Sequence, residues 1–209
     1  MGEILGLGLL LGVGAALSVG PIFVTILQEA AARGFGASLR VILGSATADL
    51  VLLLPALAFA WVLSAIMAAR MWVGLAGVLL FVVFAAQALF DSRMLWRGGA
   101  PKPVEGWAFW KGVASNLANP LTWTFWVATG TPTMLRAQEL GGWPGLAVFT
   151  VTWFVVASGL EAAIAYGVAR SGKRVGARGQ AVLTGVSALV FAGLAVVLFV
   201  RDVAPAVWA

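Results

Sequence analysis

Residues 4–30 read ILGLGLLLGVGAALSVGPIFVTILQEA, an apolar stretch that is long enough to cross a membrane and has Gly20-Pro21 inside it. A helix of about 20 apolar residues crosses the roughly 30 Å hydrocarbon layer of a bilayer. Pro21 has no N–H group, so the carbonyl of Leu17, four residues earlier, loses its helical partner and needs another one. The stretch therefore predicts a transmembrane helix with a break in it.

Five further apolar stretches of similar length predict five more helices. They cover about residues 37–64, 71–90, 112–134, 143–169 and 181–200. Hydrophobic residues make up 62% of the 209 residues and charged residues only 10%, whereas a typical soluble domain has about 25% charged residues. A chain of this size cannot bury so much apolar surface in a core, so the surplus must face lipid. The sequence thus predicts an all-α membrane protein with six transmembrane helices.

The six predicted helices divide into two halves of three. The first repeat covers residues 1–91 and the second covers residues 112–209, with a polar cytoplasmic linker at residues 92–111 between them. Because each half has an odd number of spans, the second half enters the membrane upside down relative to the first. The sequence therefore predicts two inverted three-helix repeats.

Each half begins with a helix that contains a break. Asn119-Pro120 lies inside the fourth predicted helix, as Gly20-Pro21 lies inside the first, and frees the carbonyl of Asn116. A simple proline kink would explain either break alone. Broken helices at matching places in inverted repeats, however, are typical of secondary transporters, which bind substrate near the membrane centre at the breaks. Trp123 and Trp126, which follow the second break, are expected either to line a cavity or to face lipid.

Two acidic residues lie inside predicted helices, Asp49 in the second and Glu161 in the fifth. A charged carboxylate at the centre of a membrane helix costs roughly 2.5–3.5 kcal/mol. Each acid is therefore a candidate for holding a substrate ammonium or a coupling proton; a neutral carboxyl, or a hydrogen bond to a neighbouring helix, is the structural alternative. Together, the breaks and the acids predict a substrate-binding set of Gly20, Pro21, Asp49, Asn116, Asn119, Pro120 and Glu161.

The basic residues predict the orientation of the chain in the membrane. Ten Lys and Arg residues, Arg33 and Lys111 among them, follow the first, third and fifth predicted helices, and three lie on the opposite side. Positive charges concentrate in cytoplasmic loops, so both termini are expected outside the cell. The net charge of +5 is thus interpreted as a signal of topology rather than of nucleic-acid binding.

Small residues recur every four positions in the first predicted helix and make one smooth face: Gly8, Gly12, Ala16 and Gly20. Such a face lets another helix approach closely. It predicts either internal packing or the contact surface of a homodimer.

The chain has no Cys and no His. This composition excludes disulfides, thiolate or imidazole metal sites, and Ser-His or Cys nucleophiles. No cofactor and no metal site is expected. A membrane enzyme is the weaker alternative, because Asp49 and Glu161 would have to act as a pair of carboxyls.

Four motifs follow one another in the first half: Ser18-Val19-Gly20-Pro21, Arg33-Gly34-Phe35-Gly36, Gly44 and Asp49. Together with the segment that runs from Gly112 to Asn119-Pro120 in the second half, they resemble the signature of the lysine exporter (LysE/RhtB) family of amino-acid exporters. The resemblance covers essentially the whole chain. It implies six helices, a cytoplasmic-membrane location, and export of small amino acids or related solutes coupled to protons.

Two positions depart from the pattern of that family. Val19 replaces the first proline of its P-G-P motif, and Leu121 stands where many members carry Lys after Asn-Pro. The second change removes a positive charge from the membrane, so a metal-ion exporter or a passive channel stays an alternative. The hypothesis from sequence is a secondary transporter in which both broken helices line one substrate site and the two halves rock to alternate access. Its expected partners are membrane lipid, an amino-acid-like solute and a coupling proton.

Overall fold

The computed structural model describes the chain except for residues 19, 59–69, 100–105 and 208–209. All regular secondary structure in the described part is helical, as predicted. In chain order the helices are α1 (Gly2–Leu17), α2 (Pro21–Arg33), α3 (Phe35–Ala58), α5 (Arg70–Trp96), α6 (Trp107–Leu117), α7 (Pro120–Phe125), the π-helix η1 (Trp126–Gly130), α8 (Thr131–Leu198), the π-helix η2 (Phe199–Val203) and α9 (Ala204–Val207).

The first predicted break is present between α1 and α2, whose axes are bent by 63°. Helix α1 ends at Leu17, and α2 begins at Pro21 after Gly20, whose backbone is extended with φ −137° and ψ −174°. Proline suits the first position of a helix, because the N–H group that it lacks would have no helical partner there. The local sequence thus ends one helix and starts the next.

The second predicted break separates α6 from α7. The carbonyl of Asn116 accepts a hydrogen bond from the Asn119 N–H (3.1 Å), which replaces the bond that Pro120 cannot donate. The indole N–H of Trp123 donates to the carbonyl of Leu117 (2.7 Å). Protein groups therefore satisfy the freed carbonyls, as a break inside a membrane requires. Trp123 has a specific role in this break, which neither expectation for it included.

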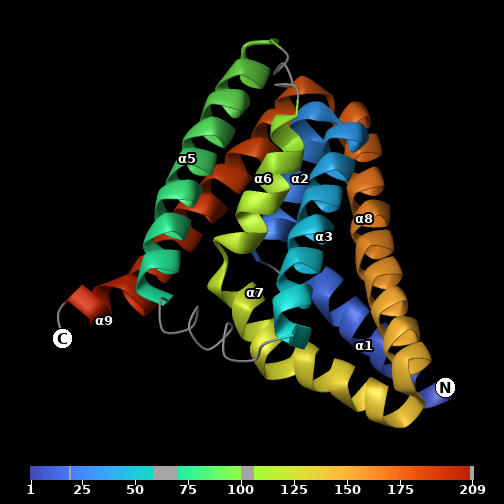
Figure 1. The fold of residues 1–209 in the computed structure, drawn as a ribbon. Coiled ribbons are helices and arrows are strands. Elements are labelled where there is room, and N and C mark those ends of the chain that lie inside the picture. The colour runs from blue at the N-terminus through green and yellow to red at the C-terminus, as the bar shows by residue number, and fades with distance from the viewer. Residues whose placement is uncertain (19, 59–69, 100–105, 208–209) are drawn as a thin grey trace.

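Helix α8 is the longest element, with 68 residues, and it contacts α1, α2, α3 and α5. A straight helix of this length would extend for about 100 Å. Figure 1 shows instead that α8 folds back on itself, running along the lower end of the molecule, rising beside α1 and descending again toward α9. Gly142 lies between the fourth and fifth predicted helices and has φ 62°, a conformation that is open to glycine but costly for other residues.

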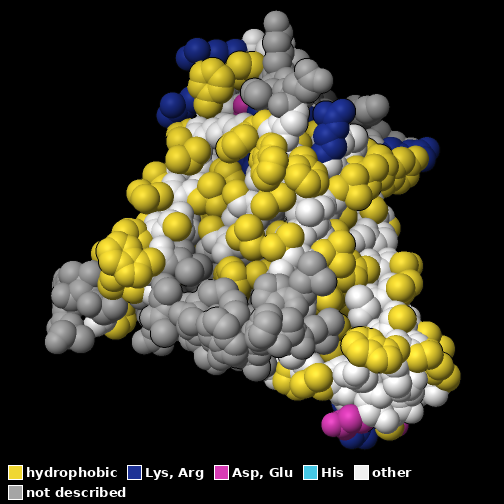
Figure 2. Space-filling view, viewed as in Figure 1, with side chains coloured by type: hydrophobic (Ala, Val, Ile, Leu, Met, Phe, Trp, Pro, Cys, Tyr) yellow, Lys and Arg dark blue, Asp and Glu magenta, His cyan; other side chains and the backbone are white. Residues whose placement is uncertain are grey.

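Several helices are long and apolar enough to cross a membrane. Within the described residues four qualify singly, and the bent pair α1–α2 raises the number to five. The four are Phe35–Leu53, Gly74–Trp96, Thr122–Ser171 and Ala177–Leu198, and the pair is Gly2–Leu17 with Pro21–Arg33. The stretch Thr122–Ser171 has 50 residues, more than twice the roughly 20 that one crossing needs. Side chains such as Leu79, Val155 and Leu189 are exposed on these helices, and Figure 2 shows apolar side chains spread over the middle of the visible face. The chain is a multi-pass membrane protein.

The small-residue face of α1 packs inside the molecule. Gly8 and Gly12 are buried, and a Cβ atom on either would lie 2.9 Å from a side chain of α8, Thr152 or Val156 respectively. Close approach of α1 to α8 thus explains the four-residue spacing. The homodimer stays a prediction.

A buried network of charged side chains joins α2, α5 and α6. Arg33 pairs with Glu29 through Nη1 (2.9 Å) and with Asp91 through Nη2 (2.7 Å). The ammonium of Lys111 pairs with the same Glu29 oxygen (3.0 Å) and donates a second hydrogen bond to Gln28. Gln28 in turn donates to Asp91 (3.3 Å). We call these five residues the α2 network; its two acids and two bases balance in charge.

The interpretation of Arg33 and Lys111 as loop charges was wrong. Both belong to helices, and their side chains are 7% and 0% exposed. The Lys111 Nζ atom also lies 4.8 Å from the ring centroid of Phe84, a cation–π distance. Helix α5 continues to Trp96 and α6 begins at Trp107, so both extend into residues 92–111; the division of the chain at this linker stays a prediction.

Candidate functional site

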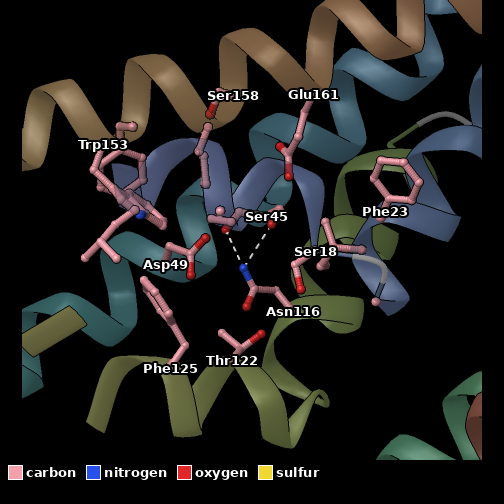
Figure 3. A pocket seen from close by; sticks show the side chains of 18 of the residues that line it. Ser18, Phe23, Ser45, Asp49, Asn116, Thr122, Phe125, Trp153, Ser158 and Glu161 are labelled. Carbon is pink, nitrogen blue, oxygen red and sulfur yellow. Dashed lines mark hydrogen bonds between the residues drawn. The ribbon is translucent and has the colours of Figure 1, made fainter. Parts of the chain in front are cut away.

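A cavity of about 340 Å³ lies where the two helix breaks meet α3 and α8. Polar side chains from all four regions face it, and Figure 3 shows them converging from different helices. Aromatic rings form much of the remaining wall: Phe23, Phe125, Trp153 and Phe154. The cavity is at the small end of the roughly 300–1,000 Å³ that is usual for ligand pockets.

Most of the predicted substrate-binding residues line this cavity. They come from both halves of the sequence, from the two breaks and from the two acid-bearing helices: Gly20, Asp49, Asn116, Asn119 and Glu161. Pro21 is buried at the start of α2 but is not part of the cavity wall. Pro120 starts α7, and its side chain lies outside the described set. The prolines thus shape the breaks, whereas neighbouring residues face the cavity.

Asn116 links the second break to α3. Its Nδ2 atom donates to the carbonyl of Ser45 (3.0 Å) and to the Ser45 hydroxyl (2.9 Å). A carbonyl can only accept, so these bonds fix the orientation of the amide. The Oδ1 atom of Asn116 is buried and has no hydrogen-bond partner among the residues that the structure describes. An acceptor without a donor from the described chain thus lies beside the cavity.

Asp49 is held by Trp126, which follows the second break in η1. The indole Nε1–H donates to Asp49 Oδ1 at 2.9 Å, across 77 positions of sequence. Trp126 is 2% exposed, so it packs in the core rather than facing lipid. A carboxylate in a membrane needs such a donor, but no local pattern in the sequence identifies Trp126 as that donor.

Glu161 reaches the cavity from α8. Among the residues that the structure describes, none forms a hydrogen bond or an ion pair with its carboxyl group. Glu161 and Asp49 are close enough to interact electrostatically, and Figure 3 shows both carboxyl groups directed toward the cavity interior. The two acids that the sequence singled out therefore share one site.

The site presents hydrogen-bond acceptors and two acidic side chains. No Lys or Arg occurs among its described lining residues. Carboxyl, amide and hydroxyl oxygens beside aromatic rings suit an ammonium or another cation. In the described ranges, no group of three or more His, Cys, Asp or Glu gathers in a way that could hold a metal ion.

A multi-pass helical protein with a polar cavity at two helix breaks belongs to the class of membrane transporters. The family model for LysE type translocators matches residues 13–202, and the chain belongs to this family. The resemblance seen in the motifs is thereby confirmed. Searches of curated proteins and of solved structures find no significant match. The family consists of transporters rather than enzymes, and the chain is a membrane transporter.

Proposed function

We propose that this protein is a secondary transporter that exports amino acids or related amine-bearing solutes across the cytoplasmic membrane in exchange for protons. The observation that carries the proposal is the cavity at the two helix breaks, in which Asp49 and Glu161 face the same space. A solute with an ammonium group would bind between these acids, and the other polar side chains of the wall would orient it.

Exchange follows from the chemistry of a carboxyl group in a dry site. Leaving a buried carboxylate without a counter-charge is costly, so the group is neutralised either by a proton or by the ammonium of a solute. One carboxyl group cannot hold a proton and pair with a solute ammonium at the same time. Binding of the solute on one side and of protons on the other therefore couples their movements. A membrane potential adds about 2.3 kcal/mol per 100 mV for each net charge that one cycle moves.

The proposed architecture has six spans in two inverted repeats, residues 1–91 and 112–209. The reversal of α8 within Thr122–Ser171 supports two crossings there, and the matching helix breaks support the repeat. Even without Arg33 and Lys111, the Lys and Arg residues after the odd-numbered spans outnumber those on the opposite side, which supports both termini outside. Rocking of the two halves about the cavity would then alternate its access.

The test is gradient-dependent efflux from proteoliposomes, with Asp49→Asn as the decisive variant. Asn keeps an oxygen for the Trp126 N–H and loses the charge, so the variant should fold and its efflux should fall at least about tenfold, the equivalent of 1.4 kcal/mol. Glu3→Gln is the control, because Glu3 is an exposed acid paired with Arg136 far from the cavity. Normal efflux by Asp49→Asn at normal abundance would refute the assigned role, and efflux that ignores the gradient would indicate a channel.

A further inference from the structure

We infer that the cavity is built for an organic amine without a carboxylate, and best for one with two ammonium groups. This inference rests on the proposed transport function and narrows its substrate class. It separates the ligand from ordinary amino acids, all of which carry a carboxylate.

The charges around the cavity favour a ligand that is only positive. Asp49 and Glu161 are the ionisable groups of the described wall, which holds no Lys or Arg. Arg33 and Lys111 are already paired with the acids of the α2 network. A ligand carboxylate would thus find no basic partner and would lie beside two acids, which repel it once they ionise to pair with an ammonium; juxtaposed like charges cost several kcal/mol.

The unpaired acceptors point to a ligand that donates hydrogen bonds. Asn116 is 2% exposed, and its Oδ1 atom has no partner among the described residues, while Ser45 fixes the amide in this orientation. The Glu161 carboxyl also receives no hydrogen bond within the described chain. An ammonium offers N–H donors and no acceptor, so it suits the Glu161 carboxyl, and any ligand group that reaches the buried Asn116 Oδ1 must also be a donor.

The start of α2 is the place where a carboxylate could bind instead. Helix N-termini attract anions through their free N–H groups. Here Pro21 has no N–H group, and the Val24 N–H is bonded to the Gly20 carbonyl (3.1 Å). That bond is the ordinary first bond of a helix, so the first turn keeps the Ile22 and Phe23 N–H groups and has one donor fewer than an ordinary helix N-terminus. It is therefore a reduced site for a carboxylate.

Two positive charges fit better than one because the acids lie on different elements. Asp49 projects from α3 and Glu161 from α8, and Figure 3 shows them on different sides of the cavity. The wall also carries the rings of Phe23, Phe125 and Phe154, which suit a chain of methylene groups. A short diamine could place one ammonium at each acid.

The experiment compares three probes that share one carbon chain: 1,5-diaminopentane, lysine and pentylamine. Lysine adds a carboxylate to the diamine, and pentylamine lacks its second ammonium. Binding to the purified full-length protein is measured by tryptophan fluorescence, since Trp153 lines the cavity. The diamine should bind at least about tenfold more tightly than either other probe, given about 1.5–3 kcal/mol for a hydrogen bond to a charged group. Lysine binding as tightly as the diamine would overturn the inference.

Variants of Glu161 test the second charge. Glu161→Gln should weaken diamine binding at least about tenfold and should weaken pentylamine binding less, so that the diamine loses most of its advantage over pentylamine. Glu161→Asp keeps the charge and should keep the preference for the diamine, whereas Glu3→Gln should change nothing. An unchanged preference in folded Glu161→Gln, judged by its melting curve, would refute the role of two acids.

The same probes separate this inference from the proposed function. Gradient-dependent efflux of lysine with no preference for the diamine would overturn the ligand class and leave the transporter standing. Tight diamine binding without efflux of any probe would support the ligand class and refute transport. Neither binding nor efflux from folded protein would refute both.

Discussion

Replacing Lys111 with Met would remove one of the two positive charges of the α2 network. Lys111 is fully buried and pairs with Glu29 at 3.0 Å. Its loss leaves Glu29 and Asp91 facing Arg33 alone, so the buried group acquires one net negative charge. Removing one partner from a buried ion pair costs about 3–5 kcal/mol. Met fills much of the same volume, so this cost reflects charge rather than a cavity.

Thermal unfolding in detergent measures this cost. A chain of this length loses roughly 2–4 °C of melting temperature per kcal/mol, so Lys111→Met should melt about 6–20 °C lower. The control is Arg136→Met, which breaks the exposed pair with Glu3 (side chains 58% and 55% exposed) and should cost at most about 1 kcal/mol.

A double variant decides whether charge balance is the cause. Lys111→Met with Glu29→Gln leaves the network neutral, with the Arg33–Asp91 pair intact. It should recover more than half of the stability that Lys111→Met loses, because neither remaining charge is unpaired. If the double variant melts no higher than the single one, or if Lys111→Met melts like the parent protein, the reasoning fails.

Two further changes test the packing and the second break. Gly12→Leu should lower stability by at least about 1–3 kcal/mol, because its Cβ would lie 2.9 Å from Val156. The control Gly6→Leu should be neutral, because nothing lies within 4 Å of the added Cβ. Equal melting temperatures of the two variants would contradict this packing. Trp123→Phe should cost about 1–3 kcal/mol by leaving the Leu117 carbonyl without its indole donor, and a variant with parental stability in a thermal unfolding assay would show that another group satisfies that carbonyl.

The sequence predicted the parts of the fold that depend on local chemistry. Hydropathy marked the helices, because a lipid-facing helix must be apolar along its length. The breaks at Gly20-Pro21 and Asn119-Pro120 were predictable since a proline cannot donate to the carbonyl four residues earlier. Asp49 and Glu161 were candidates from the sequence, because a carboxylate is costly at the centre of a membrane helix.

The sequence could not predict the partners of these groups. Trp126 and Asp49 are 77 positions apart, and Lys111 and Glu29 are 82 apart; only the packing of helices brings them together. A basic residue between two apolar stretches is interpreted as a loop charge, whether or not the folded structure places an acidic side chain beside it. For that reason Lys111 was assigned to a loop, although it is buried in α6.

The position of α2 between the cavity and its network has a mechanical consequence. This helix has 13 residues, a rigid rod of about 20 Å, with one end at the cavity and the other clamped to α5 and α6. A glycine stands at each end of the rod, Gly20 and Gly34, and Gly34 has φ 87°. A tilt of the rod by about 10° around its α5–α6 end would shift its cavity end by about 3 Å, so a small rotation at the network would become a displacement at the first break. Gly20 and Gly34 are the points at which the chain would bend during such a tilt.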